Sequence, residues 1–154
     1  MVEQTFAREQ ILEWLSEVSD PEIPVLTITD LGIVRDVDCS EGVTVSLTPT
    51  YSGCPATEVI ESSVAAALEE RGVEDVTIRR VLSPPWTTDW ITPEGREKLR
   101  VYGIAPPERR ERPIACPRCG SDKTDVVSEF GSTACKAAYK CLDCLEPFEY
   151  FKCL

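Results

Sequence analysis

The sequence contains no histidine. Histidine is the commonest general base near neutral pH, the usual partner of a nucleophilic serine or cysteine, and the commonest nitrogen ligand of metals. Without it, chemistry must rest on thiols, carboxylates and backbone groups, and a cysteine nucleophile has no histidine base. A thiol hydrolase or oxidoreductase is therefore disfavoured, and we expect an accessory protein that is not an enzyme.

The sequence also lacks a long hydrophobic run. No uninterrupted apolar segment approaches the roughly 20 residues that span a bilayer. The first ten residues, MVEQTFAREQ, show no basic region followed by an apolar one. We therefore expect a cytoplasmic protein with no membrane partner. Cysteines are kept reduced in that compartment, so paired cysteines favour metal binding over disulfides.

Basic side chains are scarce relative to acidic ones. The chain has 16 lysines and arginines against 27 aspartates and glutamates, a net charge of −11. Residues 1–112 alone carry −10, from 21 acidic and 11 basic side chains. Nucleic-acid binding draws much of its affinity from cationic side chains that release counterions. We therefore expect no nucleic-acid partner.

Cysteine, by contrast, is concentrated at the end of the chain, where six of the eight lie in the last 39 residues. Two pairs have the form Cys-x-x-Cys: Cys116 with Cys119, and Cys141 with Cys144. Each such turn directs two thiolates at one point, so the two turns can hold a tetrahedral zinc ion. The 21 residues between the pairs slightly exceed the usual roughly 15 to 20 and indicate a full hairpin. We expect a structural site, because four cysteines leave no open position for a substrate.

Cys135 and Cys153 lie outside both pairs. The pattern predicts strands at 124–130, 133–140 and 147–153. If the last two strands pair antiparallel, residue numbers across the pair sum to roughly 287; Cys135 and Cys153 sum to 288. They could therefore face each other as a disulfide or a second thiolate pair. The alternative is two buried, inert thiols.

The remainder of the chain predicts an α+β domain. Two prolines in the segment 20–24 end the first predicted helix. Hydrophobic periodicity, together with proline and glycine positions, predicts helices at 6–18, 55–72 and 93–103 and strands at 33–39, 43–49 and 73–82. The fold class is therefore an α-β-β-α-β-α domain followed by a β zinc ribbon.

The segment APPERRERP is proline-rich and charged and has no hydrophobic periodicity, which is typical of a linker. We therefore expect a first domain at residues 1–104, a linker at 105–113 and a four-cysteine zinc ribbon at 114–154.

Cys54 occupies the predicted start of a helix. The chain leaves a strand, turns at Ser52-Gly53 and places Cys54 directly before Pro55. Free backbone N–H groups and the helix dipole stabilise a thiolate at such a position. The negative charge of the domain acts against this. The alternative is a structural cysteine.

Three segments resemble the MIP18 (DUF59) family of iron–sulfur assembly proteins: DPEIPVLTITDLGIV (20–34), TPTYSGCP (48–55) and SPPWTTDWI (83–91). The tail, with CPRCGS, FGSTACKA and EPFEYFKC, is similar to that of the branch found in bacterial phenylacetate-degradation operons. The resemblance covers nearly the whole chain.

The resemblance implies maturation or repair of a metal centre in aerobic phenylacetate catabolism. The centre would be the diiron site of phenylacetyl-CoA epoxidase or the iron–sulfur cluster of its reductase, so the implied partner is one of these client proteins. The alternative is a non-catalytic structural subunit of the epoxidase complex. A homodimer is plausible by the same resemblance.

By the resemblance, Cys54 matches the motif cysteine of the family and is the expected transient ligand of iron or of an iron–sulfur cluster. Asp20 and Glu22 match its acidic segment, and Thr50 and Trp86 fall in the other two matching segments. We place these four in the wall of a pocket. The alternatives are Asp20 as a turn cap, Trp86 as a core aromatic and Thr50 as an ordinary strand residue.

Overall fold

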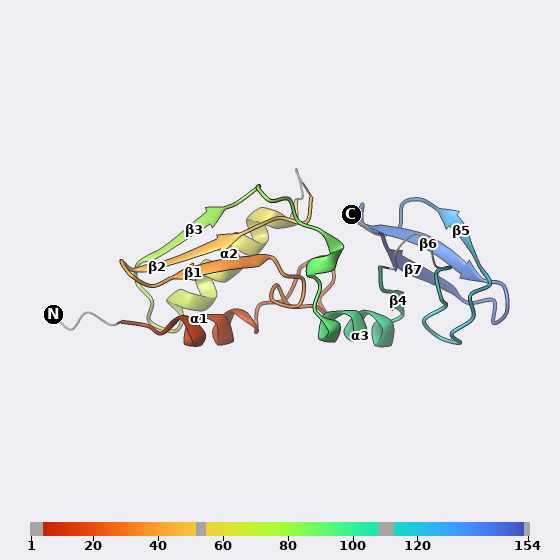
Figure 1. Cartoon of the computed structure of the whole chain (residues 1–154), viewed down its shortest axis with the longest axis horizontal. Helices are drawn as coiled ribbons and strands as arrows, with labels where there is room; N and C mark the ends of the chain where they lie inside the picture. The colour runs from red at the N-terminus through yellow and green to blue at the C-terminus, as the bar shows by residue number, and fades with distance from the viewer. Residues whose placement is uncertain (1–4, 52–54, 108–112, 153–154) are drawn as a thin grey trace. The chain divides into compact units, whose positions relative to one another are not determined.

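The structure is a computed structural model that describes residues 5–51, 55–107 and 113–152 (Figure 1). Its contacts divide the chain into two compact units, Met1–Thr92 and Pro93–Leu154, and each is described by itself. In the described residues, no helix is long and apolar enough to cross a membrane.

The first unit is built on a three-stranded sheet of order β1-β2-β3. β1 (Val34–Asp38) and β2 (Val43–Leu47) form an antiparallel hairpin, and β3 (Val76–Arg80) pairs parallel with β2. The predicted hairpin and third strand are therefore confirmed.

Two helices pack against this sheet. α1 (Arg8–Leu15) contacts β1 and α2 (Ala56–Glu69), and α2 contacts β3; Figure 1 shows α1, in red, along the lower side of the sheet. Pro55 has helical dihedral angles (φ −65°, ψ −21°) directly before α2, which fits the predicted helix start. The shared core contains these fully or nearly fully buried side chains: Ile11, Leu15, Val45, Leu47, Ile60, Val64 and Leu68.

Two of the family-like segments pack together in this unit. The backbone N–H of Thr92 donates to the carbonyl of Asp30 at 2.9 Å. The indole N–H of Trp86 donates to the carbonyl of Leu31 at 2.7 Å, and the guanidinium of Arg35 lies over the ring of Trp90, 3.6 Å from its centroid. Segments 20–34 and 83–91 therefore form one structural element.

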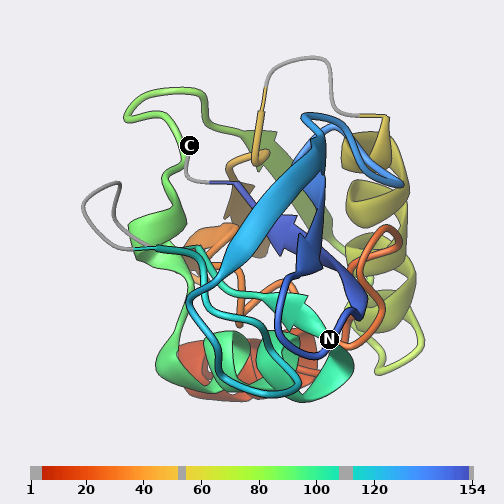
Figure 2. The same ribbon diagram turned by 90° about the vertical axis from the view of Figure 1, so that its right-hand side faces the viewer.

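The second unit begins with α3 (Pro93–Tyr102) and continues into a four-stranded sheet of order β4-β7-β6-β5. The strands are β4 (Ile104–Ala105), β5 (Thr124–Ser128), β6 (Lys136–Cys141) and β7 (Pro147–Phe151). β5, β6 and β7 are antiparallel and lie side by side in Figures 1 and 2. The predicted zinc-ribbon strands are therefore confirmed.

The sequence pattern and the contacts differ over the start of this unit. The pattern assigned 93–104 to the first domain and began a linker at residue 105, whereas the contacts group α3 with the ribbon. The physical reason is β4, in which Ile104 and Ala105 pair with Glu149 and Tyr150 of β7. A two-residue strand is too short to show a hydrophobic period.

Candidate functional site

The four cysteines of the two Cys-x-x-Cys turns converge on one point in the second unit. Cys116 and Cys119 lie in the turn before β5, Cys141 is the last residue of β6, and Cys144 lies in the next turn. Their four sulfur atoms all lie within 4.8 Å of one another. The Sγ atoms of Cys116 and Cys144 are 3.7 Å apart, and those of Cys119 and Cys141 are 3.5 Å apart.

These distances fit a zinc ion. Tetrahedral zinc with Zn–S bonds of about 2.3 Å requires sulfur atoms about 3.8 Å apart. The backbone N–H of Cys144 donates to Sγ of Cys141 at 3.4 Å, and this hydrogen bond lowers the pKa of the Cys141 thiol to about 7. A thiol that ionises readily is a good metal ligand. Four protein thiolates complete the coordination, so the site fits a structural role.

The tail has a small apolar core around the cysteines. Phe148 and Tyr150 of β7 cluster with Cys116 and Cys141, and Tyr139 packs against this cluster. The cluster is small, because few side chains of the tail are fully buried. Such a module depends on its metal for much of its folding free energy.

A second candidate site is a narrow hollow in the first unit, where the predicted pocket residues Asp20, Glu22 and Thr50 meet. Glu61 of α2, which the sequence analysis did not identify, adds a third carboxylate. The other lining residues are Ile33, Leu47, Pro49, Thr57 and Ile60. The centre of a water molecule can occupy about 20 Å³ of this hollow, which is enough for about one water.

Asp20 is held rigidly at the wall of the hollow. Its side chain is buried, at 6% exposure, and its Oδ1 accepts hydrogen bonds from the backbone N–H groups of Glu22 and Ile23, both at 2.8 Å. Asp20 therefore caps the turn, as the alternative prediction held, and also lines the hollow.

Trp86 is placed differently from the other three predicted pocket residues. It is not among the described residues that line the hollow. It is 5% exposed, and its N–H is used in the hydrogen bond to Leu31. The geometry matches the alternative of a core aromatic, because burial of an indole requires such an acceptor.

Glu61 could have been found from helical spacing. Thr57 and Glu61 stand four residues apart on α2, so they share the face that lines the hollow. Its partner could not have been found this way. Arg80 of β3 donates from Nε and Nη2 to the two carboxylate oxygens of Glu61, at 2.9 and 3.1 Å.

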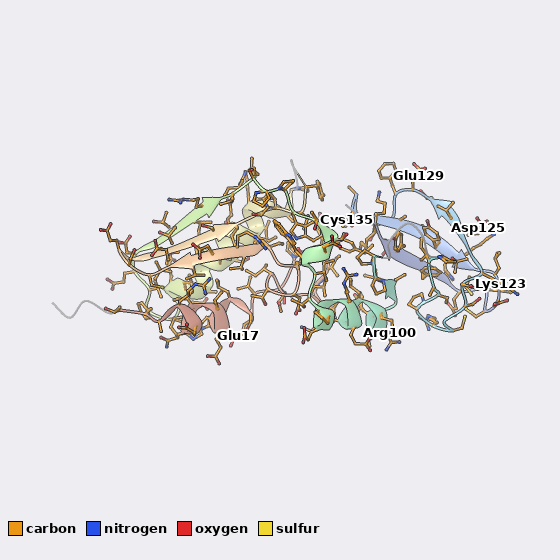
Figure 3. The ribbon with its side chains drawn as sticks, viewed as in Figure 1. Glu17, Arg100, Lys123, Asp125, Glu129 and Cys135 are labelled. Carbon is orange, nitrogen blue, oxygen red and sulfur yellow. The ribbon has the colours of Figure 1, made fainter. Side chains whose placement is uncertain are left out.

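The cysteines outside the metal centre differ in what can be said of them. Cys54 and Cys153 lie outside the described residues, so both remain predictions. β6 and β7 pair with residue numbers that sum to 287, as predicted, and the N–H of Lys152 donates to the carbonyl of Cys135. Cys135 is buried at the start of β6, with its Sγ 3.0 Å from Oγ1 of Thr133 (Figure 3).

Cys39 is a poor candidate for a reactive thiol. Burial raises its pKa, and the neighbouring Asp38 carboxylate raises it further. A thiol with a raised pKa carries little nucleophilic thiolate at neutral pH.

Comparisons with known proteins agree with both parts of this description. Residues 8–79 match the family model described as "Iron-sulfur cluster assembly protein", and residues 105–152 match the "PaaD zinc beta ribbon domain". The hollow lies mostly within the first match, and all four clustered cysteines lie within the second.

Relatives extend the similarity over the whole chain. A protein of Escherichia coli K12 that is named as a "Putative 1,2-phenylacetyl-CoA epoxidase" component is 52% identical, over 97% of each chain. The Bacillus subtilis Fe-S protein maturation auxiliary factor YitW is 41% identical over 53% of this chain and 82% of its own.

Solved structures match the first unit. A DUF59 domain from Bacillus anthracis has a TM-score of 0.55 and 28% identity, covering 60% of this chain and 90% of its own. A conserved hypothetical protein from Thermotoga maritima has a TM-score of 0.53 and 33% identity, covering 64% and 98%. The chain therefore belongs to the DUF59 (MIP18) family of iron–sulfur cluster assembly proteins, in the branch that carries a PaaD zinc ribbon.

Proposed function

We propose that this protein is a non-catalytic factor that helps to insert or repair a metal centre of the phenylacetyl-CoA epoxidase system. Its client would be the diiron oxygenase or the iron–sulfur reductase, and its cargo would be iron or an iron–sulfur cluster held transiently. The general iron–sulfur assembly role follows from the family. The epoxidase client is suggested by the name of the Escherichia coli relative.

One observation carries the proposal. The hollow is formed by the two family-like segments 20–34 and 48–55, together with α2. In the sequence, Cys54 stands between Thr50 and Thr57, and both of these line the hollow. A thiol supplied by this connection would add a soft ligand to three carboxylates, a donor set that suits iron.

The zinc ribbon has a separate role in this proposal. A closed four-cysteine site cannot take part in exchange without losing its own metal and its fold. We therefore assign transient cargo to the first unit and client docking to the ribbon. A protein client is also favoured over nucleic acid by the net charge of −11.

The test is Cys54→Ser, with Cys39→Ser as a matched control in the same unit. Each variant is co-expressed with the oxygenase and its reductase, and iron and sulfide per client chain are measured. We expect Cys54→Ser to lower the metal content of one client by about tenfold, the order of what loss of a supporting ligand costs a metal site. Cys39→Ser should behave as the wild type. Normal client iron with Cys54→Ser would refute the role of Cys54.

The second candidate function is a structural component of the epoxidase complex, which the name of the Escherichia coli relative favours. It predicts co-purification with the oxygenase at fixed stoichiometry. An effect on client iron at substoichiometric amounts favours the maturation factor instead.

A further inference from the structure

Arg80 and Glu61 form a two-point ion pair at the border of the hollow. Arg80 is the last residue of β3, and Glu61 lies in the middle of α2. Arg80 Nε and Nη2 contact separate carboxylate oxygens of Glu61, at 2.9 and 3.1 Å. The Glu61 side chain is 25% exposed and the Arg80 side chain 45% exposed. The pair is therefore open to solvent on the arginine side and can separate at little cost.

The other charges of the hollow are all negative. Asp20, Glu22 and Glu61 line it, and no lysine or arginine is among the described lining residues. The Asp20 carboxylate is stabilised by two backbone N–H donors. The Glu61 carboxylate is balanced by Arg80, which stands outside the lining. Carboxylates in one narrow space repel one another unless a positive charge is near.

We propose that Arg80 takes the place of a cationic cargo when the hollow is empty. On entry of a small divalent cation, Glu61 separates from Arg80 and turns to the cation, and the guanidinium of Arg80 moves into solvent. No bond other than this ion pair breaks and no electron moves. On departure of the cation, Arg80 pairs with Glu61 again. This inference rests on the proposed function, because it assigns the cargo of that site a cationic form.

The exchange would keep the cargo loosely held. Arg80 competes with the cation for Glu61 and repels it directly, so it lowers affinity and favours release to a client. Removal of one positive charge at this distance should tighten cation binding by about threefold to tenfold. Removal of the Glu61 charge should weaken it by a similar factor.

The experiment measures Mn²⁺ binding to the whole zinc-loaded protein by the loss of the free-ion electron paramagnetic resonance signal. Mn²⁺ prefers oxygen ligands and does not displace zinc from four thiolates. The variants are Arg80→Gln and Glu61→Gln. The matched control is Arg79→Gln, which removes the same charge from the neighbouring residue of β3, whose side chain points to the opposite face of the sheet.

We expect Arg80→Gln to bind Mn²⁺ more tightly than the wild type and Glu61→Gln to bind it more weakly, with Arg79→Gln unchanged. Melting temperatures are recorded in parallel. A purely structural ion pair would lower both melting temperatures without moving the two affinities in opposite directions, and that result overturns the inference. Equal tightening by Arg79→Gln and Arg80→Gln also overturns it, since the effect would then be one of net charge.

Absence of Mn²⁺ binding to the wild type overturns the inference as well. The proposed function is judged separately, by client iron with Cys54→Ser. A client effect without an Arg80 effect would retain the maturation role and reject the exchange of Arg80 for the cation.

Discussion

Gly32 and Trp90 approach so closely that a Cβ on residue 32 would lie 2.5 Å from the carbonyl oxygen of Trp90. Gly32 also has a φ of +70°, which L side chains rarely adopt. The contact joins the DLG turn of the segment 20–34 to the end of the SPPWTTDWI segment. Glycine at this position therefore allows the two family-like segments to pack together.

Gly32→Ala should destabilise the first unit by about 2 kcal/mol or more, because it combines backbone strain with a steric overlap. Gly72→Ala is the matched control: its φ is +87°, but nothing lies within 4 Å of the added Cβ, so only strain of about 1 kcal/mol applies. Denaturation followed by tryptophan fluorescence reports on this unit, since Trp14, Trp86 and Trp90 all belong to it. Equal losses in the two variants would contradict the steric argument.

Asp20 has two roles that substitution can separate. Asp20→Asn keeps an Oδ1 acceptor for the N–H groups of Glu22 and Ile23 but removes the charge. Its stability should stay close to that of the wild type, while client iron falls if the carboxylate holds the cargo. Asp20→Ala leaves both N–H groups unpaired and should cost about 1 to 3 kcal/mol.

The measurements for Asp20 are denaturation midpoints and client iron, each for both variants. Wild-type client iron with Asp20→Asn would leave the residue with its turn-capping role alone.

Cys116→Ser should unfold the ribbon and leave the first unit folded. Its Sγ is one of the four clustered ligands, and Cys116 itself belongs to the apolar cluster with Phe148 and Tyr150. Since metal binding supplies much of the folding free energy of such a module, loss of one ligand removes both. Zinc per chain should fall to near zero, and aromatic proton resonances of the tail should lose their dispersion.

Chelation of zinc from the wild-type protein should reproduce these changes in the tail, while tryptophan fluorescence of the first unit stays constant. A ribbon that keeps dispersed resonances after complete zinc removal would disprove the structural role of the metal.

Several elements were predictable because their causes are local. The period of apolar residues identified α1 and α2, and alternation identified β1, β2 and β3. The β6–β7 register followed from the positions of the last two strands, because an antiparallel pair keeps a constant sum of residue numbers.

Other features were not predictable, because they depend on contacts between distant segments. β4 has only two residues and is a strand only through its pairing with β7. The composition of 105–113 therefore indicated a linker that begins one residue inside a strand. Trp86 was placed with the pocket residues, but its N–H meets a carbonyl 55 residues earlier in the chain.

The sequence by itself determined the metal centre and the family. Each Cys-x-x-Cys turn is local, so spacing alone brings two thiolates together, and the motif order is visible without a fold. Only the tertiary structure decided which charges share the hollow. Asp20 and Glu22 come from a turn, Glu61 from a helix and Arg80 from a strand. No spacing rule relates these elements; the packing of α2 against the sheet places the carboxylates together and one arginine beside them.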